Sequence, residues 1–278
     1  MEIKAYSKIN LLLRVLGERE DGYHELETIM HTIDLYDIVR IEKSDKIRVS
    51  ADVELPENNI SKKAVMLYSE FSEKSSGIKV GAEIFIKCAI PSQSGLGSAS
   101  ADCSAVLKGL DVLYGTVDKK QLYEIALMCG ADVPFQLMGG CAYAGGIGEK
   151  LVKLNKINAD ILLVKPEDGI STKYLFDRVN CNDDKLDRET IFDVVNSGDV
   201  ERISKIIENS LEDAAIEYLP VINDIKNAVL EYGALSSCMT GSGSCVYGIF
   251  KNRLDAVNAE KNIKKIFKNC FTYVGKTV

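Results

Sequence analysis

A stretch of small residues between an apolar run and a helix-forming run is the part of this sequence best suited to bind phosphate. Residues 91–104 are Pro-Ser-Gln-Ser-Gly-Leu-Gly-Ser-Ala-Ser-Ala-Asp-Cys-Ser. Gly95 and Gly97 have no Cβ and can adopt positive φ, so the backbone there can approach a ligand closely. A following helix would begin with N–H groups that lack intrahelical partners and with a dipole that favours anions. The pattern therefore predicts a phosphate-binding loop.

Two common phosphate-binding signatures are absent from this loop. No Lys follows Gly97, as the G-x-x-x-x-G-K-[ST] loop requires, and the third Gly of G-x-G-x-x-G is missing. An ordinary strand–helix turn is the structural alternative, because Gly and Ser are common at turns and helix caps. In the functional interpretation, hydroxyls and backbone amides contact a nucleotide. The candidate residues are Pro91, Ser94, Gly95, Leu96, Gly97, Ser98, Ala99, Ser100 and Ala101.

Lys8 and Asn10 stand two residues apart in the run Ala5-Tyr-Ser-Lys-Ile-Asn-Leu. On a strand, residues two apart point to the same face, so a cation and an amide would lie side by side. Such a pair could bind a hydroxyl or a phosphate of a substrate. A solvated strand face is the alternative, because Lys side chains are usually exposed.

Tyr23 and His24 follow a turn in Asp21-Gly-Tyr-His. Adjacent Tyr and His side chains can stack on a flat heterocycle and hydrogen-bond to it. The alternative is a hairpin that the aromatic residues simply fill.

Asp132 lies at a helix break, in Gly130-Ala-Asp-Val-Pro134. A carboxylate there could orient an attacking hydroxyl and accept its proton. The alternative is an N-cap for a helix that starts at Val133, with Pro just inside the first turn.

The elements that must position these residues predict an α+β protein. Apolar alternation and amphipathic runs indicate strands and helices, respectively. Expected strands are residues 2–16, 25–33, 37–43, 46–51, 82–90, 161–164, 235–239, 245–250 and 270–274. Expected helices are 61–73, 101–114, 118–129, 199–208, 210–218, 221–233 and 254–267, and segment 168–188 is expected to be mostly helical. The closely spaced strands near the N-terminus predict antiparallel pairing.

Composition restricts the class of protein. The 278 residues are 46% apolar, which predicts a globular chain large enough for two lobes. The formal net charge of −7 argues against nucleic acid or an anionic membrane as partner. Eight scattered Cys without a C-x-x-C pair, and only two His, argue against a zinc or iron–sulfur site. No signal sequence or membrane-length apolar run is visible, so we expect a cytoplasmic protein.

Together these residues resemble the motifs of the GHMP kinases, the family of galactokinase and of homoserine, mevalonate and phosphomevalonate kinases. Pro91–Ser98 resembles their second motif, and Cys238-Met-Thr-Gly-Ser-Gly-Ser244 resembles their third. The stretches around Lys8, His24 and Asp132 are similar to the branch that acts on a cytidyl diphosphate methylerythritol, and their order matches along nearly the whole chain. One difference is that Ser98, Ala99 and Ala101 stand where that branch usually has Gly, Gly and Ser.

The resemblance implies an ATP-dependent kinase that phosphorylates the 2-hydroxyl of the methylerythritol unit in the non-mevalonate isoprenoid pathway, with ATP and Mg²⁺ as cofactors. It implies that Asp132 is the general base and that Lys8 hydrogen-bonds to the acceptor hydroxyl and to Asp132. Phe176 would complete a cytosine pocket with Tyr23 and His24, although Tyr174 is a competing aromatic. The implied substrate-binding residues are Asn10, Tyr23, His24, Asp132, Thr172, Phe176, Gly241 and Ser242.

The resemblance also implies the fold, a two-lobed GHMP kinase. Residues 1–156 would form a nucleotide-binding lobe like domain 2 of ribosomal protein S5, and residues 157–278 a ferredoxin-like lobe. A sister GHMP kinase that acts on another small alcohol, and a non-catalytic paralogue that serves as a binding module, are the alternatives. The sequence identifies no metal ligands and leaves the chain as a monomer or a homodimer.

Overall fold

The computed structural model describes residues 1–179, 181 and 187–278, and these residues form two compact units. Unit 1 comprises residues 1–7, 35–90 and 97–138, and unit 2 comprises residues 8–34, 91–96 and 139–278. The first two strands, β1 (Glu2–Glu18) and β2 (His24–Lys43), contribute to both units. The described residues form two sheets, in the strand orders β3-β4-β2-β1-β8, with β5 and β6 joined to β2, and β11-β7-β10-β9.

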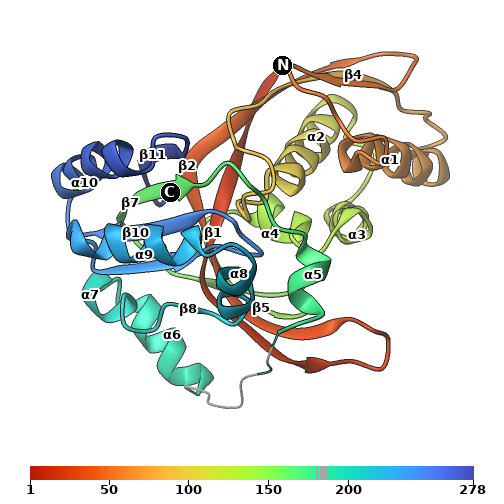
Figure 1. Cartoon of the computed structure of the whole chain (residues 1–278). Helices are drawn as coiled ribbons and strands as arrows, with labels where there is room; N and C mark the ends of the chain where they lie inside the picture. The colour runs from red at the N-terminus through yellow and green to blue at the C-terminus, as the bar shows by residue number, and fades with distance from the viewer. Residues whose placement is uncertain (180, 182–186) are drawn as a thin grey trace. The chain divides into compact units, whose positions relative to one another are not determined.

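In unit 1, helices cover one face of the sheet. Strand β4 (Ala82–Lys87) alternates buried and exposed residues, pairs antiparallel with β2, and pairs parallel with β3 (Arg48–Ala51). Its buried residues pack against α1 (Ile60–Ser76) and α2 (Ser98–Tyr114) (Figure 1). The remaining helices of this unit are α3 (Lys119–Cys129) and α4 (Val133–Met138). The alternation along β4 buries apolar area on one face only, as expected for a strand with helices on one side.

Local capping explains where these helices begin and end. Asn59 accepts hydrogen bonds from two first-turn amides of α1, and Gly77, with φ of 71°, ends that helix. Asp118 and Gln121 form a reciprocal capping box at the start of α3. These caps satisfy backbone groups that the helices themselves leave without partners.

Unit 2 contains the second sheet and most of the C-terminal residues. Strands β7 (Asp160–Lys165), β9 (Ser236–Met239), β10 (Val246–Phe250) and β11 (Phe271–Lys276) pair antiparallel, and α9 (Val221–Glu231) and α10 (Arg253–Ile266) pack against them (Figure 1). Strands β5 (Cys141–Gly146), β6 (Lys150–Leu154) and β8 (Glu208–Asn209) extend the first sheet. The other helices of unit 2 among the described residues are α5 (Thr172–Phe176), α6 (Arg188–Asn196), α7 (Val200–Ile203) and α8 (Glu212–Tyr218).

The predicted α+β class is confirmed, but several predicted elements were wrong. Residues 24–43 form one strand rather than two, because Asp34, which interrupts the apolar pattern, accepts hydrogen bonds from the Lys276 amide and the Tyr273 hydroxyl. Strand β3 pairs with β4 in parallel, not antiparallel with its sequence neighbour, since β4 lies between β3 and β2.

The remaining differences lie in the second half of the chain. Residues 150–154, near the expected boundary, form β6, and the helix expected at 199–208 is the short α7 followed by β8. Helix α6 was not expected. In the predicted helical segment 168–188, residues 180 and 182–186 lie outside the described residues. The division of the chain at residue 156 stays a prediction.

Three further observations bear on chemistry. All eight cysteines are free thiols. Among residues 1–179, 181 and 187–278, no three His, Cys, Asp or Glu side chains gather as a metal site. No helix in the part of the chain that the structure describes is both long and apolar enough to cross a membrane.

Candidate active site

The two glycine loops predicted from the sequence contact each other in unit 2. The Ser244 amide donates to the Gln93 carbonyl and the Cys245 amide donates to the Ser94 carbonyl, both at 3.2 Å. Gly95 lies against the Thr240 carbonyl so closely that a Cβ on Gly95 would stand 1.9 Å from its oxygen. Only glycine fits this contact, which gives Gly95 a packing reason besides the ligand approach and the turn considered from the sequence.

The second half of the phosphate loop is the start of α2 in unit 1. The helix begins at Ser98, three residues before the predicted start, and its N-cap is Gly97 with φ of 74°. The first turn, Ser-Ala-Ser-Ala, carries no acidic side chain. Burial and the neighbouring Asp37 raise the pKa of Asp102 to about 8, so this carboxyl group is neutral at pH 7. These features suit the binding of a polyanion by first-turn amides.

Lys8 is buried, with 4% of its surface exposed, which excludes the solvated strand face as its setting. Its Nζ donates to Asn10 Oδ1 at 2.6 Å, and its amide donates to the Leu96 carbonyl at 3.0 Å. A Cβ on Gly241 would stand 3.1 Å from Lys8 Nζ. The backbone of Lys8 therefore contacts the first glycine loop, and its ammonium group lies beside Gly241 of the second.

Asn10 is held by four protein groups. Its amide donates to Thr240 Oγ1 at 3.0 Å, and its carbonyl accepts from the Tyr247 hydroxyl at 2.9 Å. Its side-chain Nδ2 donates to Thr28 Oγ1 at 2.8 Å, while Oδ1 accepts from Lys8. Contact of Asn10 with substrate hydroxyls stays a prediction.

The aromatic residues predicted to bind a base are only partly brought together. The rings of His24 and Phe176 lie 5.1 Å apart at 40°. Tyr174 instead pairs with Tyr218, with ring centroids 4.7 Å apart, so Phe176 is the aromatic of α5 that faces His24. Tyr23 is 60% exposed, and its backbone amide donates a hydrogen bond to Asp21 Oδ1.

Thr172 and Ser242 connect α5 with the C-terminal glycine loop. Their hydroxyl oxygens lie 2.8 Å apart on an exposed surface. Because Phe176 lies one helical turn after Thr172, the same short helix contacts both the ring of His24 and this loop. Through α5, contacts thus link four of the predicted substrate residues of unit 2, which are His24, Phe176, Thr172 and Ser242.

Asp132 lies in unit 1, at the N-cap position of α4. Its carbonyl accepts from the Gln136 amide at 3.1 Å, and its side chain is half-buried. The capping position predicted as the structural alternative is therefore present in the backbone. It does not conflict with a catalytic role, because the backbone carbonyl makes this bond and not the carboxylate. That catalytic role stays a prediction.

Sequence reasoning missed the residues that support these groups from behind. Asn209 Nδ2 donates to the carbonyls of Met239 and Gly241, each at 2.8 Å, and Glu212 accepts from the Met239 amide. Thr28 binds Asn10 as described above. A polar residue in an apolar strand was the available signal for Thr28, whereas Asn209 had none, because its two-residue strand was expected as helix or turn.

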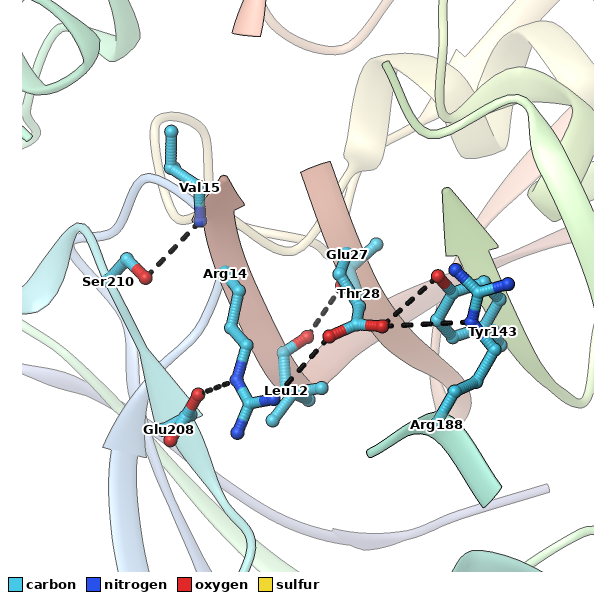
Figure 2. Close-up of polar contacts among 9 residues, drawn as sticks. All are labelled: Leu12, Arg14, Val15, Glu27, Thr28, Tyr143, Arg188, Glu208 and Ser210. Atoms are coloured by element: carbon cyan, nitrogen blue, oxygen red, sulfur yellow. Dashed lines mark hydrogen bonds and ion pairs between the residues drawn. The ribbon is translucent and has the colours of Figure 1, made fainter. Parts of the chain in front are cut away.

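An ion-pair network anchors the strand that carries Lys8 and Asn10. Figure 2 shows the buried Arg14 guanidinium between Glu208 on β8 and Glu27 on β2. Glu27 also accepts from the Tyr143 hydroxyl at 3.2 Å and lies 3.9 Å from Arg188. Because both buried charges are paired, the network joins β1 to its neighbours without leaving an uncompensated ion.

Comparison with known proteins defines the class. Residues 59–140 match the family model "GHMP kinases N terminal domain", and residues 191–269 match "GHMP kinases C terminal". The chain belongs to the GHMP kinases, which are ATP-dependent small-molecule phosphotransferases. The family, the fold and the kinase activity expected from the sequence are confirmed.

The comparisons also indicate which GHMP kinases the chain closely resembles. The chain is 41% identical to the 4-diphosphocytidyl-2-C-methyl-D-erythritol kinase of Caldicellulosiruptor bescii, over 96% of each chain. It is 39% identical to the enzyme of that name from Clostridium tetani, over 100% of each chain. A crystal structure of 4-(cytidine 5'-diphospho)-2C-methyl-D-erythritol kinase matches with a TM-score of 0.83 and 29% identity, covering 100% of this chain and 99% of the other. Homoserine kinase from Cytophaga hutchinsonii, at 21% identity and a TM-score of 0.75 (100% and 94% covered), shares the fold.

Proposed function

We propose that this chain transfers the γ-phosphoryl group of ATP to the 2-hydroxyl of 4-diphosphocytidyl-2-C-methyl-D-erythritol, in the cytoplasmic methylerythritol phosphate pathway of isoprenoid synthesis. Relatives of that name match the chain from end to end. The structural observation that carries the substrate assignment is the contact between His24 and Phe176, from segments far apart in the sequence. The other alcohols that this family phosphorylates, such as mevalonate, homoserine and galactose, carry no nucleobase for two aromatic rings to bind.

The cytosine would lie against these rings. Stacked or tilted aromatic pairs bind flat heterocycles, and His24 can hydrogen-bond to the base edge. Tyr23 is exposed and can swing onto the base, since its backbone is fixed by Asp21 while its ring is in solvent. Thr172 and Ser242 offer adjacent hydroxyls for the polar part of the substrate.

The ATP phosphates would be bound by the glycine loop and the first turn of α2. The fit is supported by positive φ at Gly95 and Gly97 and by a first turn free of acidic side chains. Mg²⁺ would neutralise phosphate charge when bound with ATP. Asp102, neutral beside Asp37, adds no negative charge at this end of the helix.

The chemical step needs few protein groups. The acceptor oxygen attacks the γ-phosphorus, the bond to the β–γ bridging oxygen breaks, ADP leaves, and the hydroxyl proton passes to the carboxylate of Asp132. Lys8 stabilises the negative charge that develops on the acceptor oxygen. Phosphoryl transfer depends mainly on positioning and electrostatics, so a base, a cation and an amide cradle suffice.

A coupled assay of ADP release tests the proposal. Purified protein with Mg²⁺-ATP would be given 4-diphosphocytidyl-2-C-methyl-D-erythritol, mevalonate, homoserine or galactose in parallel. We expect turnover with the cytidyl substrate alone. Turnover with another of these alcohols would contradict the substrate assignment and leave the GHMP kinase class intact.

A further inference from the structure

Thr28 makes two hydrogen bonds that together fix its hydroxyl as the donor in one and the acceptor in the other. Its Oγ1 donates to the Leu12 carbonyl at 2.6 Å (Figure 2). It also lies 2.8 Å from Asn10 Nδ2. A hydroxyl carries one hydrogen, and here that hydrogen is committed to Leu12, so toward Asn10 the oxygen can only accept.

Lys8 imposes the complementary requirement on the other side of Asn10. An ammonium group donates and never accepts, so the atom 2.6 Å from Lys8 Nζ has to be an oxygen. Thr28 selects Nδ2 and Lys8 selects Oδ1, so both neighbours require the same orientation of the Asn10 amide. A flipped amide would set NH₂ against the ammonium and Oδ1 against an oxygen that cannot donate.

We propose that Thr28 is a positioning residue for phosphoryl transfer, which fixes the amide of Asn10 so that its oxygen holds the ammonium group of Lys8 in place. The inference rests on the catalytic role proposed for Lys8. The backbone of Asn10 is held by Thr240 and Tyr247. At the side-chain amide, Oδ1 lies 2.6 Å from Lys8 Nζ and 3.4 Å from Thr240 Oγ1, whereas Thr28 holds the Nδ2 end.

Burial makes the hydroxyl difficult to replace. Thr28 and Asn10 are each 3% exposed, and Lys8 is 4% exposed. A buried polar group that loses its partner carries the full cost of its desolvation, because solvent cannot take the partner's place. Removing the Thr28 hydroxyl would therefore leave Asn10 Nδ2 and the Leu12 carbonyl without this bond at the same time.

Thr32 provides a matched control on the same strand. It is also buried, at 5% exposure, and its Oγ1 accepts from the Gly140 amide at 3.0 Å. Thr32→Val removes a buried hydroxyl from β2 without touching Asn10 or Lys8. A purely structural role for Thr28 predicts equal effects of the two substitutions, whereas a positioning role predicts different ones.

The test compares Thr28→Val, Thr28→Ser and Thr32→Val in the complete protein. We expect Thr28→Val to lower kcat about tenfold, the loss that one buried hydrogen bond corresponds to, with KM for ATP and for the acceptor unchanged. Thr28→Ser keeps the hydroxyl and should restore kcat, and Thr32→Val should retain it. Wild-type kcat in Thr28→Val, or equal losses in Thr28→Val and Thr32→Val, would overturn the proposal.

A second measurement needs no turnover. The side-chain NH₂ of Asn10, assigned by its disappearance in Asn10→Asp, should give slowly exchanging NMR signals in the wild type, Thr28→Ser and Thr32→Val. In Thr28→Val we expect fast exchange, and unchanged slow exchange there would overturn the proposal. If the wild type fails to phosphorylate the cytidyl substrate, the proposed function fails, while the NMR comparison still decides the role of Thr28.

Discussion

Gly95 and Thr240 meet where the two glycine loops of unit 2 join, and the contact leaves no space for a side chain. A Cβ on Gly95 would stand 1.9 Å from the Thr240 oxygen and 2.9 Å from the Gly243 nitrogen. Backbone atoms cannot move aside as the end of a flexible side chain can. The contact therefore fixes the spacing of the loop that holds Lys8 through the Leu96 carbonyl.

Gly95→Ala should abolish ADP release by separating these loops. Gly77→Ala is the matched control, because Gly77 has nearly the same φ, 71° against 72°, but open space around its Cα. Both variants bear the cost of an L-residue in the left-handed region, about 1–2 kcal/mol. Assays of ADP release, together with thermal melts, separate backbone strain from loss of the loop contact. An equal loss of activity in the two variants would show that backbone strain, not the loop contact, is responsible.

Asp132→Ala should lower kcat by about 100-fold or more, the usual effect of removing a positioned base, while ATP binding persists. Asp118→Ala serves as a control, since Asp118 is also an aspartate at a helix N-terminus and caps α3. That control should cost about 1 kcal/mol of stability and leave kcat as it is. Steady-state kinetics and nucleotide titration measure both; normal kcat in Asp132→Ala would remove the base assignment.

His24→Ala should raise KM for the cytidyl substrate more than KM for ATP, because the facing ring of Phe176 loses its partner. Tyr174→Leu, on the same helix but paired with Tyr218, should leave both KM values close to those of the wild type. Parallel increases in the two KM values of His24→Ala would indicate a general loss of structure instead of a lost base contact.

Most of the strands, the main helices and the turn at Gly97 before α2 could be predicted from local pattern, because alternation, caps and glycine spacing involve consecutive residues. The same-face placement of Lys8 and Asn10 followed from their spacing. Their burial did not, since it depends on Thr240, which is 230 residues away from Asn10. Without that partner, the usual exposure of Lys was the better expectation.

Other features depended on tertiary choices that local pattern does not express. Phe176 rather than Tyr174 faces His24 because the ring of Tyr174 packs against Tyr218. The parallel pairing of β3 depends on β4, which follows it by a whole helix. The support that Asn209 gives to the Met239 and Gly241 carbonyls depends on a two-residue strand too short to leave a period.

Asp102 should make stability depend on pH in a direction opposite to that of most carboxylates. Asp37 Oδ1 accepts from the amides of Ala89 and Ile90, at 2.5 and 2.8 Å, whereas no donor among the described residues reaches Asp102 Oδ1. Asp102 therefore takes the proton of the pair. Burial, followed by the charge of Asp37, raises its pKa from 3.8 to about 8.

Between these two pKa values the folded state binds more protons at Asp102 than the unfolded state, so this contribution to the free energy of unfolding falls as pH rises. The contribution is fully present below about pH 4 and is lost as the pH passes through about 8. Asp102→Asn supplies an uncharged donor to Asp37 at every pH and should remove this slope, whereas Asp111→Asn, further along α2, should keep it. Urea unfolding at pH 6, 7 and 8 gives the slopes; equal slopes in the wild type and Asp102→Asn would mean that Asp102 is ionised in the folded protein.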